Sequence, residues 1–311
     1  MPFALEYDAI TKEYRSWSGQ RRVRALQQFS LSVERGEIFG FLGPNGAGKS
    51  TAIHLAMGFM RPSSGGGRML GKPFGEAATR RRVGFLAENV ALYHRRAKAA
   101  IRFYGGLNGL HGAALDRSTR SALEAVDLQS ESTRNLGQFS RGMLQRMGLA
   151  QALVNDPELL ILDEPTSALD PAARVSIREL LLRFRSQGKT IFLSSHLLSE
   201  VELVCDRVAI LSRGRVVRIG TLSAMLETTD QVELVARSIS ESLFAKSTVE
   251  GERIRFAVPK TQQREAIERV WTAGGEVVSV NPVRRSLEEL FLELTSPESS
   301  AVELAARERG D

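Results

Sequence analysis

A run of eight residues has the composition of a phosphate-binding loop. It consists of Gly43, Pro44, Asn45, Gly46, Ala47, Gly48, Lys49 and Ser50. Glycines let the backbone turn tightly, so that successive N–H groups point inward and form a nest for an anion. Lys49 is then placed to reach the β- and γ-phosphates of a nucleotide, and Ser50 to ligate Mg²⁺ through its hydroxyl. The pattern therefore predicts nucleotide binding.

A strand is expected before this loop and a helix after it, which is the usual setting of a phosphate-binding loop. Residues 37–42 read as a short buried strand leading into it, and residues 50–59, with Thr51 in the first turn, read as a helix. The positive end of that helix is expected to face the phosphates. A plain glycine-rich turn is the competing interpretation, and the strand–loop–helix context favours nucleotide binding.

A second segment places two carboxylates at the end of an apolar run. Residues 159–162 are Leu-Leu-Ile-Leu, and Asp163 and Glu164 follow directly. At the tip of a central strand, Asp163 is expected to hold Mg²⁺ through its water shell. Glu164 is expected to face the attacking water as general base or positioning group. Taken alone, the segment also fits a buried strand that stops at two surface acids.

Three further segments complete a recognisable order of motifs. Residues 139–146 open a helix, residues 167–170 follow the two carboxylates, and residues 190–196 form an apolar strand that ends in His196. In this order the five motifs resemble the nucleotide-binding subunit of an ATP-binding cassette (ABC) transporter, over roughly residues 3–224. The resemblance implies a P-loop ATPase core that binds ATP and Mg²⁺.

The resemblance also implies roles for residues outside the phosphate loop. His196 matches the switch histidine that touches the γ-phosphate, and Asp170 matches the acid that communicates across a dimer interface. Ser140, Arg141 and Gly142 match the signature motif, which binds the ATP held by the opposite subunit. The expected active unit is therefore a pair of such domains with two ATP molecules between them.

Two departures from the family pattern bear on the chemistry. The commonest signature is Leu-Ser-Gly-Gly-Gln, whereas here Phe139, Arg141 and Met143 replace Leu, the first Gly and Gln. Arg141 adds positive charge near the partner's phosphates, so the site is not expected to be inactive. Glu88 stands where the family often has Gln; it is expected to coordinate a metal-bound water, and an ordinary loop acid is the alternative.

An aromatic ring near the start of the chain is the candidate for stacking on adenine. Tyr14 fits the family's place for this ring, and Trp17 is the alternative because residues 16–24 read as an inserted basic hairpin tip. Stacking of a base on either ring contributes about 1–3 kcal/mol. A partly buried strand aromatic without this role is the competing interpretation.

Composition narrows the function classes. The formal net charge is +6, Cys205 is the only cysteine, and no run approaches the roughly 18–20 apolar residues that span a bilayer. A reducing compartment and a peripheral position on the cytoplasmic face of the cell membrane are therefore expected. Basic clusters occur without interleaved aromatics or a nucleic-acid motif, so no nucleic-acid partner is expected.

The chain is expected to contain two domains. Residues 1–225 form the ATP-binding domain, with a β-rich part from 3–40 and 65–85 and a helical insert at about 89–155. Within the insert, residues 89–96 are expected to touch the membrane partner. Alternating strands and helices predict a mainly parallel α/β core. Residues 230–295 read as a small C-terminal α/β domain with strands at 231–236, 253–258 and 276–280, and residues 296–311 as a flexible tail.

The function expected is therefore that of the ATPase subunit of an ABC exporter. Its partners would be a membrane-spanning permease on a separate chain and a second copy of itself or a related ATPase subunit. An importer subunit is the first alternative, because export rests on the C-terminal domain and the Glu88 loop. A soluble ABC protein acting on ribosomes or DNA is disfavoured: the chain has one phosphate loop and no long coiled-coil insertion.

Overall fold

The chain folds into two compact units. The computed structural model describes residues 2–15, 22–90, 92, 96–167, 169–226, 228–244 and 247–295. Unit 1 comprises Met1–Leu222 with Glu293–Asp311, and unit 2 comprises Ser223–Leu292. Trp17 and the tail 296–311 lie outside the described residues, as do four positions of the predicted partner-contacting segment 89–96.

A six-stranded sheet forms the centre of unit 1. Its order is β10-β9-β3-β8-β7-β6, and every neighbouring pair is parallel except β9 with β10. The strands are β3 (Ile38–Leu42), β6 (Val83–Leu86), β7 (Leu159–Asp163), β8 (Thr190–Ser195), β9 (Arg207–Ser212) and β10 (Arg215–Thr221). All residues of β3, β7 and β8 are buried, as expected for parallel strands covered on both faces.

Helices pack against this sheet. They are α1 (Lys49–Ala56), α5 (Arg141–Leu153), α6 (Pro171–Ser186) and α7 (Leu198–Val204). The short helix α8 (Leu222–Met225) follows β10, where unit 1 ends and unit 2 begins. The approach of α7 to β3 requires glycine, because a Cβ at Gly40 would lie 2.9 Å from the side chain of Val201. The alternation of buried strands and covering helices confirms the predicted parallel α/β core.

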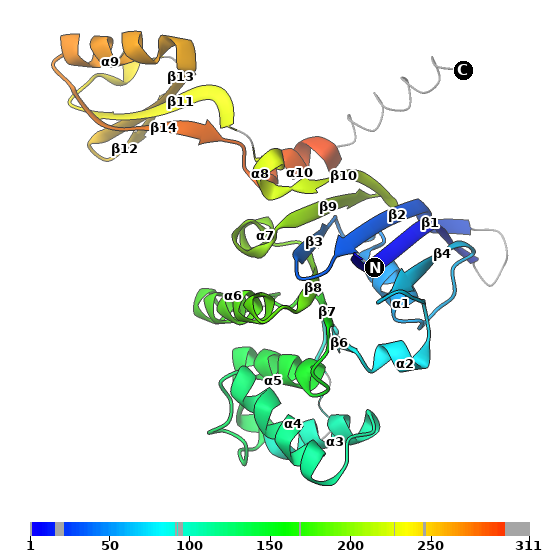
Figure 1. Cartoon of the computed structure of the whole chain (residues 1–311). Helices are drawn as coiled ribbons and strands as arrows, with labels where there is room; N and C mark the ends of the chain where they lie inside the picture. The colour runs from blue at the N-terminus through cyan, green and yellow to red at the C-terminus, as the bar shows by residue number, and fades with distance from the viewer. Residues whose placement is uncertain are drawn as a thin grey trace, which may run out of the picture. The chain divides into compact units, whose positions relative to one another are not determined.

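An antiparallel sheet packs beside the central one in unit 1 (Figure 1). Its order is β2-β1-β4-β5, with strands β1 (Phe3–Arg15), β2 (Arg22–Glu34), β4 (Ser64–Met69) and β5 (Lys72–Pro73), and α2 (Ala77–Arg80) follows it. The ring of Phe29 meets those of Tyr7 and Phe41 edge-on, at centroid distances of 4.9 and 5.8 Å. This contact joins the two sheets in one core. The expectation that residues up to 85 belong to the β-rich part is wrong for β6, which pairs with β7.

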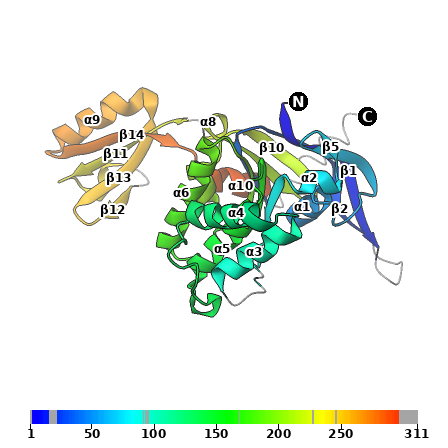
Figure 2. The ribbon, with the colours of Figure 1, turned by 60° about the horizontal axis from the view of Figure 1, so that its bottom comes forward.

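The helical insert lies where β6 forms the edge of the central sheet. It contains α3 (Ala97–Leu107), α4 (Gly112–Ala125), the 3₁₀ turn Leu136–Gln138 and α5, which gather together in Figures 1 and 2. The sequence predicts helices at 95–107, 118–127 and 140–154 in this insert, whereas the second one, α4, begins six residues earlier than predicted, at Gly112. An ion pair between Asp116 and Arg102 holds the earlier turn of α4 against α3.

Unit 2 is a four-stranded antiparallel sheet with one helix packed on it. The sheet order is β12-β13-β11-β14, with β11 (Thr228–Arg237), β12 (Thr248–Glu250), β13 (Arg253–Pro259) and β14 (Glu276–Arg284), and the helix is α9 (Gln263–Thr272). Two 3₁₀ turns lie at Glu241–Leu243 and Lys260–Gln262, and α10 spans Leu287–Thr295. Leu234, Phe256 and Val270 lie in the hydrophobic core of unit 2. β14 runs past the predicted end at Val280 because Pro282 is tolerated in an edge strand.

Candidate functional site

The phosphate-binding loop connects β3 to α1 and depends on its glycines. Gly46 and Gly48 have φ of 80° and 114°, and a Cβ at Gly48 would lie 2.5 Å from the carbonyl oxygen of Ala25. Gly48 is the N-cap of α1; no side chain caps this helix end and no acidic residue lies in its first turn. The first N–H groups of α1 are therefore available to an anion.

The register of the central sheet brings the other motifs to the same edge. Leu42 at the end of β3 pairs with Ser195 at the end of β8, and Ser194 pairs with Asp163 at the end of β7. On the next strand, Leu86 pairs with Leu162, so that Glu88 follows β6 at the same edge. The carboxyl ends of parallel strands are where ligands bind in open α/β sheets.

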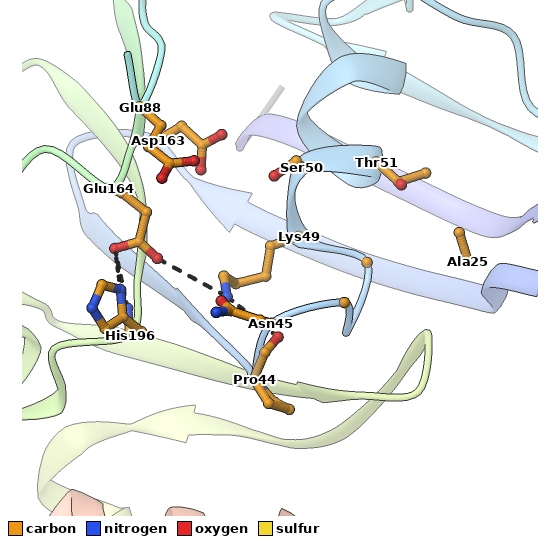
Figure 3. A pocket seen from close by; sticks show the side chains of 12 residues that line it. Ala25, Pro44, Asn45, Lys49, Ser50, Thr51, Glu88, Asp163, Glu164 and His196 are labelled. Atoms are coloured by element: carbon orange, nitrogen blue, oxygen red, sulfur yellow. Dashed lines mark hydrogen bonds and ion pairs between the residues drawn. The ribbon is translucent and has the colours of Figure 1, made fainter. Parts of the chain in front are cut away.

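These strand ends and the loop enclose a pocket of about 260 Å³ (Figure 3). Its lining combines backbone of the loop with one lysine, one histidine, three carboxylates and two hydroxyls. The lining residues are Ala25, Pro44, Asn45, Gly46, Gly48, Lys49, Ser50, Thr51, Glu88, Asp163, Glu164 and His196. The structure therefore brings together most of the residues expected to contact nucleotide; Gly43 and Ala47 belong to the loop without lining the pocket.

The side chain of Lys49 lies under the phosphate-binding loop and donates a hydrogen bond to the backbone of that loop. Its side chain is 9% exposed, and Nζ donates to the carbonyl oxygen of Gly43 at 2.5 Å and lies 4.0 Å from Glu164 Oε1. Burial lowers the pKa of Lys49, while the neighbouring carboxylates of Glu164 and Asp163 oppose this shift. The ammonium group is thus a desolvated point charge directed into an anion site.

Glu164 lies opposite Lys49 in a strained backbone conformation. Its φ of 52° is in the left-handed region, which costs an ordinary residue about 1–2 kcal/mol. Its N–H donates to the carbonyl oxygen of Ser194, and the nearby Ser167 hydroxyl donates to the carbonyl oxygen of Glu164. These bonds hold the bend that turns Glu164 out of the strand direction.

A short contact joins the Glu164 carboxylate to His196. Glu164 Oε2 lies 2.7 Å from His196 Nδ1 (Figure 3). Burial raises the pKa of Glu164, and the His196 and Lys49 charges act in the opposite direction. A carboxylate with a raised pKa, oriented by a second titratable group, has the features of a general base.

Asp163 has a partner that the sequence did not indicate. The hydroxyl of Ser194 donates a hydrogen bond to Asp163 Oδ1, which fixes the orientation of a side chain that is almost fully buried. The one sequence feature that could have indicated this partner is the pair Ser194-Ser195, which ends an otherwise apolar strand directly before His196. Ala25 was also missed, because nothing in its residue type indicates a pocket.

Comparisons with known proteins decide the family. A family model described as ABC transporter matches residues 26–167. An uncharacterized ABC transporter ATP-binding protein of Synechocystis is 38% identical, over 91% of this chain and 82% of its own length. The chain belongs to the ABC transporter ATP-binding proteins. The Nod factor export ATP-binding protein I of Sinorhizobium fredii is 33% identical, over 95% of this chain and 87% of its own length.

A solved structure agrees with this assignment. The cbiO1 protein of Clostridium perfringens, part of the ABC transporter complex cbiONQ, is 27% identical with a TM-score of 0.65. The match covers 72% of this chain and 91% of that one. The protein is an ABC ATPase with a P-loop fold, as the sequence predicts. Within the described residues, no helix is both long and apolar enough to cross a membrane.

The residues predicted to form the signature motif lie outside the Lys49 pocket of the same chain. Ser140 caps the N-terminus of α5, where its Oγ accepts a hydrogen bond from the N–H of Met143 at 3.2 Å. Asp170 caps α6 in the same way, accepting from the N–H of Ala173 at 2.8 Å. A Cβ on Gly142 would lie 3.0 Å from that of Ala173. The two helix ends are therefore neighbours, and none of Ser140, Arg141, Gly142 and Asp170 lines the pocket.

Tyr14 lies at the edge of the pocket and does not line it. Its hydroxyl is 3.4 Å from Thr51 Oγ1, which does line the pocket, and 3.3 Å from Met60 Sδ. Lys12 Nζ lies 5.4 Å from the centroid of the ring. Tyr14 is 41% exposed, so it is not the partly buried strand aromatic of the competing interpretation. Its role in base stacking stays a prediction.

Proposed function

We propose that this site hydrolyses ATP with Glu164 as the group that positions and activates water. The observation that supports this most directly is the arrangement of Glu164 between Lys49 and His196. Lys49 and the loop would hold the β- and γ-phosphates, and the buried carboxylate would face the water that attacks the γ-phosphate. His196 would orient that carboxylate and the water.

Mg²⁺ fits the donors in this pocket. Ser50, Asp163 and Glu88 offer hydroxyl and carboxylate oxygens, which are the ligands that Mg²⁺ prefers. When bound, the cation neutralises charge that develops on the transferred phosphoryl group. Asp163 is prepared for this role because Ser194 holds one of its oxygens.

ATP-binding proteins of this family dimerise and work with separate membrane permease subunits. In our proposal a second copy, or a related subunit, supplies Ser140, Arg141 and Gly142 to the ATP on Lys49, and Asp170 lies at the shared interface. Closure on ATP and reopening after hydrolysis would drive the permease at the cytoplasmic face of the membrane. The position of the signature motif outside its own pocket supports this arrangement.

Export is the direction that the relatives favour. The Nod factor export protein of Sinorhizobium fredii aligns with 95% of this chain, so the alignment includes residues of unit 2 as well as unit 1.

The test of the transport function is affinity purification of the tagged chain from native membranes, followed by reconstitution of the complex in vesicles with the ATP site outside. We expect a polytopic membrane protein to co-purify and ATP to drive substrate into these vesicles. Efflux on ATP addition would indicate import, and no membrane partner would refute the transport function.

A further inference from the structure

The backbone that follows Glu164 is tied to helix α6. The N–H and the hydroxyl of Ser167 both donate to the carbonyl oxygen of Glu164, at 3.2 and 3.0 Å. The carbonyl oxygen of Leu169 accepts a hydrogen bond from Arg174 Nε on α6 at 3.0 Å, and Asp170 caps the same helix. The position of α6 is therefore linked, through these short contacts, to the position of Glu164.

One turn further along α6, Arg178 forms an ion pair with Glu200 on the neighbouring helix α7 (Figure 1). Arg178 Nη1 lies 3.6 Å from Glu200 Oε2, and the two side chains are only 24% and 18% exposed. Within the described part of the chain, this oxygen of Glu200 is buried and accepts no hydrogen bond, so Arg178 supplies its compensating charge. A pair sheltered from water in this way is stronger than a surface pair, and removing one partner leaves an uncompensated charge.

Helix α7 follows His196 after a single residue. Glu200 lies in the first turn of this helix, and the N–H of Leu197 donates to Ser195 Oγ at 3.0 Å, which makes the connection a tight turn. His196 Nδ1 then lies 2.7 Å from the carboxylate of Glu164 (Figure 3). The contacts that leave Glu164 through its carbonyl oxygen thus return, through α6 and α7, to its carboxylate.

We propose that Arg178 and Glu200 are positioning residues for ATP hydrolysis: their ion pair fixes the first turn of α7 and so holds His196 against Glu164. This inference rests on the proposed function of the same site. In the proposed dimer Asp170 lies at the shared interface, so a movement of α6 on closure would reach His196 through this pair. The phosphate-binding loop makes none of the contacts between α6 and α7, so the pair should affect turnover and leave ATP binding unchanged.

The first measurement separates turnover from binding. In the purified complex, Arg178→Gln and Glu200→Gln should each lower kcat about tenfold to a hundredfold, since a displacement of about 1 Å costs about 10²-fold. The dissociation constant of fluorescent ATP should stay within about twofold of the wild-type value, because the phosphate-binding loop is intact. The matched control is Arg183→Gln on the same helix, whose partner Asp127 follows α4 in the helical insert. This control should leave kcat unchanged.

The double variant Arg178→Gln/Glu200→Gln distinguishes positioning from stability. Each single substitution leaves one unpaired charge and should lower the unfolding temperature, whereas the double variant leaves none and should unfold closer to wild type. Its kcat should nevertheless equal that of the single variants, because all three proteins lack the same contact. Losses of kcat that add up, or a double variant as active as wild type, would overturn the inference.

The second measurement observes the His196 ring directly. Long-range proton–nitrogen correlation spectra of the full chain, labelled at histidine, should show shifted His196 ring signals in Arg178→Gln and unchanged ones in Arg183→Gln. The variant His196→Gln identifies these signals by their loss. Unchanged His196 signals in Arg178→Gln, or a normal kcat in that variant, would contradict the inference alone. If wild type fails to hydrolyse ATP, or Glu164→Gln hydrolyses it normally, the proposed function itself is wrong.

Discussion

At the scale of single residues, Glu164 combines three unfavourable features that a structural role does not explain. The side chain is buried, its backbone is in the left-handed region, and burial raises its pKa despite a nearby lysine and histidine. Strain of this kind persists only where the surrounding structure enforces it. Here the hydrogen bond from its N–H to Ser194 and the contact with His196 provide that enforcement.

The first prediction concerns turnover. Glu164→Gln keeps the size and hydrogen bonding of the side chain but removes the base. Steady-state ATPase activity of the purified complex should fall about 10²–10⁴-fold, the range for a positioned acid–base group. Fluorescent ATP should still bind, because Lys49 and the loop are intact. Turnover close to that of wild type would contradict the assignment. So would an equally large loss in Glu124→Gln, a control that removes an exposed carboxylate from α4 outside the pocket.

Glu164→Gln also tests how much the burial of the charged Glu164 carboxylate lowers the free energy of unfolding. A carboxyl whose folded pKa lies above its unfolded value binds more protons in the native state. Stability therefore decreases as the pH rises from the ordinary glutamate pKa, about 4.3, through the folded value. Thermal unfolding of Glu164→Gln should occur at a higher temperature than that of wild type at pH 8. The two midpoints should converge toward pH 4, and a constant difference across this range would contradict the prediction.

Residue types and spacing predicted part of the pocket, and the resemblance to the family supplied the rest. The loop was predicted from its glycines, lysine and serine, and Asp163 and Glu164 from two carboxylates at the end of an apolar strand. His196 and Glu88 were predicted only from the resemblance. Ser194 and Ala25 could not be predicted in the same way. A serine in a strand and an alanine beside a loop have many common environments, and only the register of β7 with β8 and the close approach of Gly48 identify their positions.

At the scale of elements, one arginine on α6 joins the helical insert to the ATPase core. Arg183 Nη2 donates to the carbonyl oxygen of Ala125 at 2.7 Å and to Asp127 Oδ2 at 3.2 Å. Ala125 is the last residue of α4, whose terminal carbonyls have no partner within the helix. Asp127 has a φ of 58°, and its ion pair with Arg183 helps to hold this left-handed conformation.

We predict that Arg183→Ala loosens the end of α4 without unfolding the protein. Both side chains are about half exposed, so the pair contributes about 1 kcal/mol at most. Amide hydrogen exchange in the last turn of α4 should accelerate by up to about fivefold, with little change in the unfolding temperature. Arg185→Ala is the matched control, since Arg185 pairs with Asp206 beside β9. Equal exchange in α4 for both variants would refute the link.

Sequence patterns predicted the elements unevenly. β3, β7 and β8 were predicted because buried parallel strands form continuous apolar runs. The start of α4 was missed because His111 at its N-cap makes no capping hydrogen bond and the first turn has no acidic residue. The placement of β6 in the central sheet was also missed, since strand order depends on pairing between distant segments. Local patterns carry no direct information on such pairing.

At the scale of the whole molecule, the motifs of one chain do not form one site. Lys49, Asp163, Glu164 and His196 meet in one pocket, whereas the capped helix ends at Ser140 and Asp170 lie elsewhere in the same unit. In the proposed dimer Ser140 contacts the phosphate held by the second chain, so the structure of one chain cannot test that contact. The function therefore has to be tested on pairs of chains.

The last prediction tests this sharing with two inactive variants. Ser140→Arg should retain ATP on its own Lys49 but block the γ-phosphate position that Ser140 serves in the partner. Lys49→Ala should lose its own ATP and keep a normal signature motif. Each variant alone should give complexes with little ATPase activity. In a mixed pair, one site carries both lesions and the other carries none.

Equal mixing should therefore restore roughly a quarter of the wild-type activity, since half of randomly formed pairs are mixed and each holds one intact site. This estimate requires that a single site can hydrolyse ATP alone. A structure of the Glu164→Gln protein with Mg²⁺ and ATP provides the test without that requirement. Ser140 in contact with the γ-phosphate bound by Lys49 of the other chain is the expected result. The same contact within one chain would refute the shared site, because rescue by mixing would then have no physical basis.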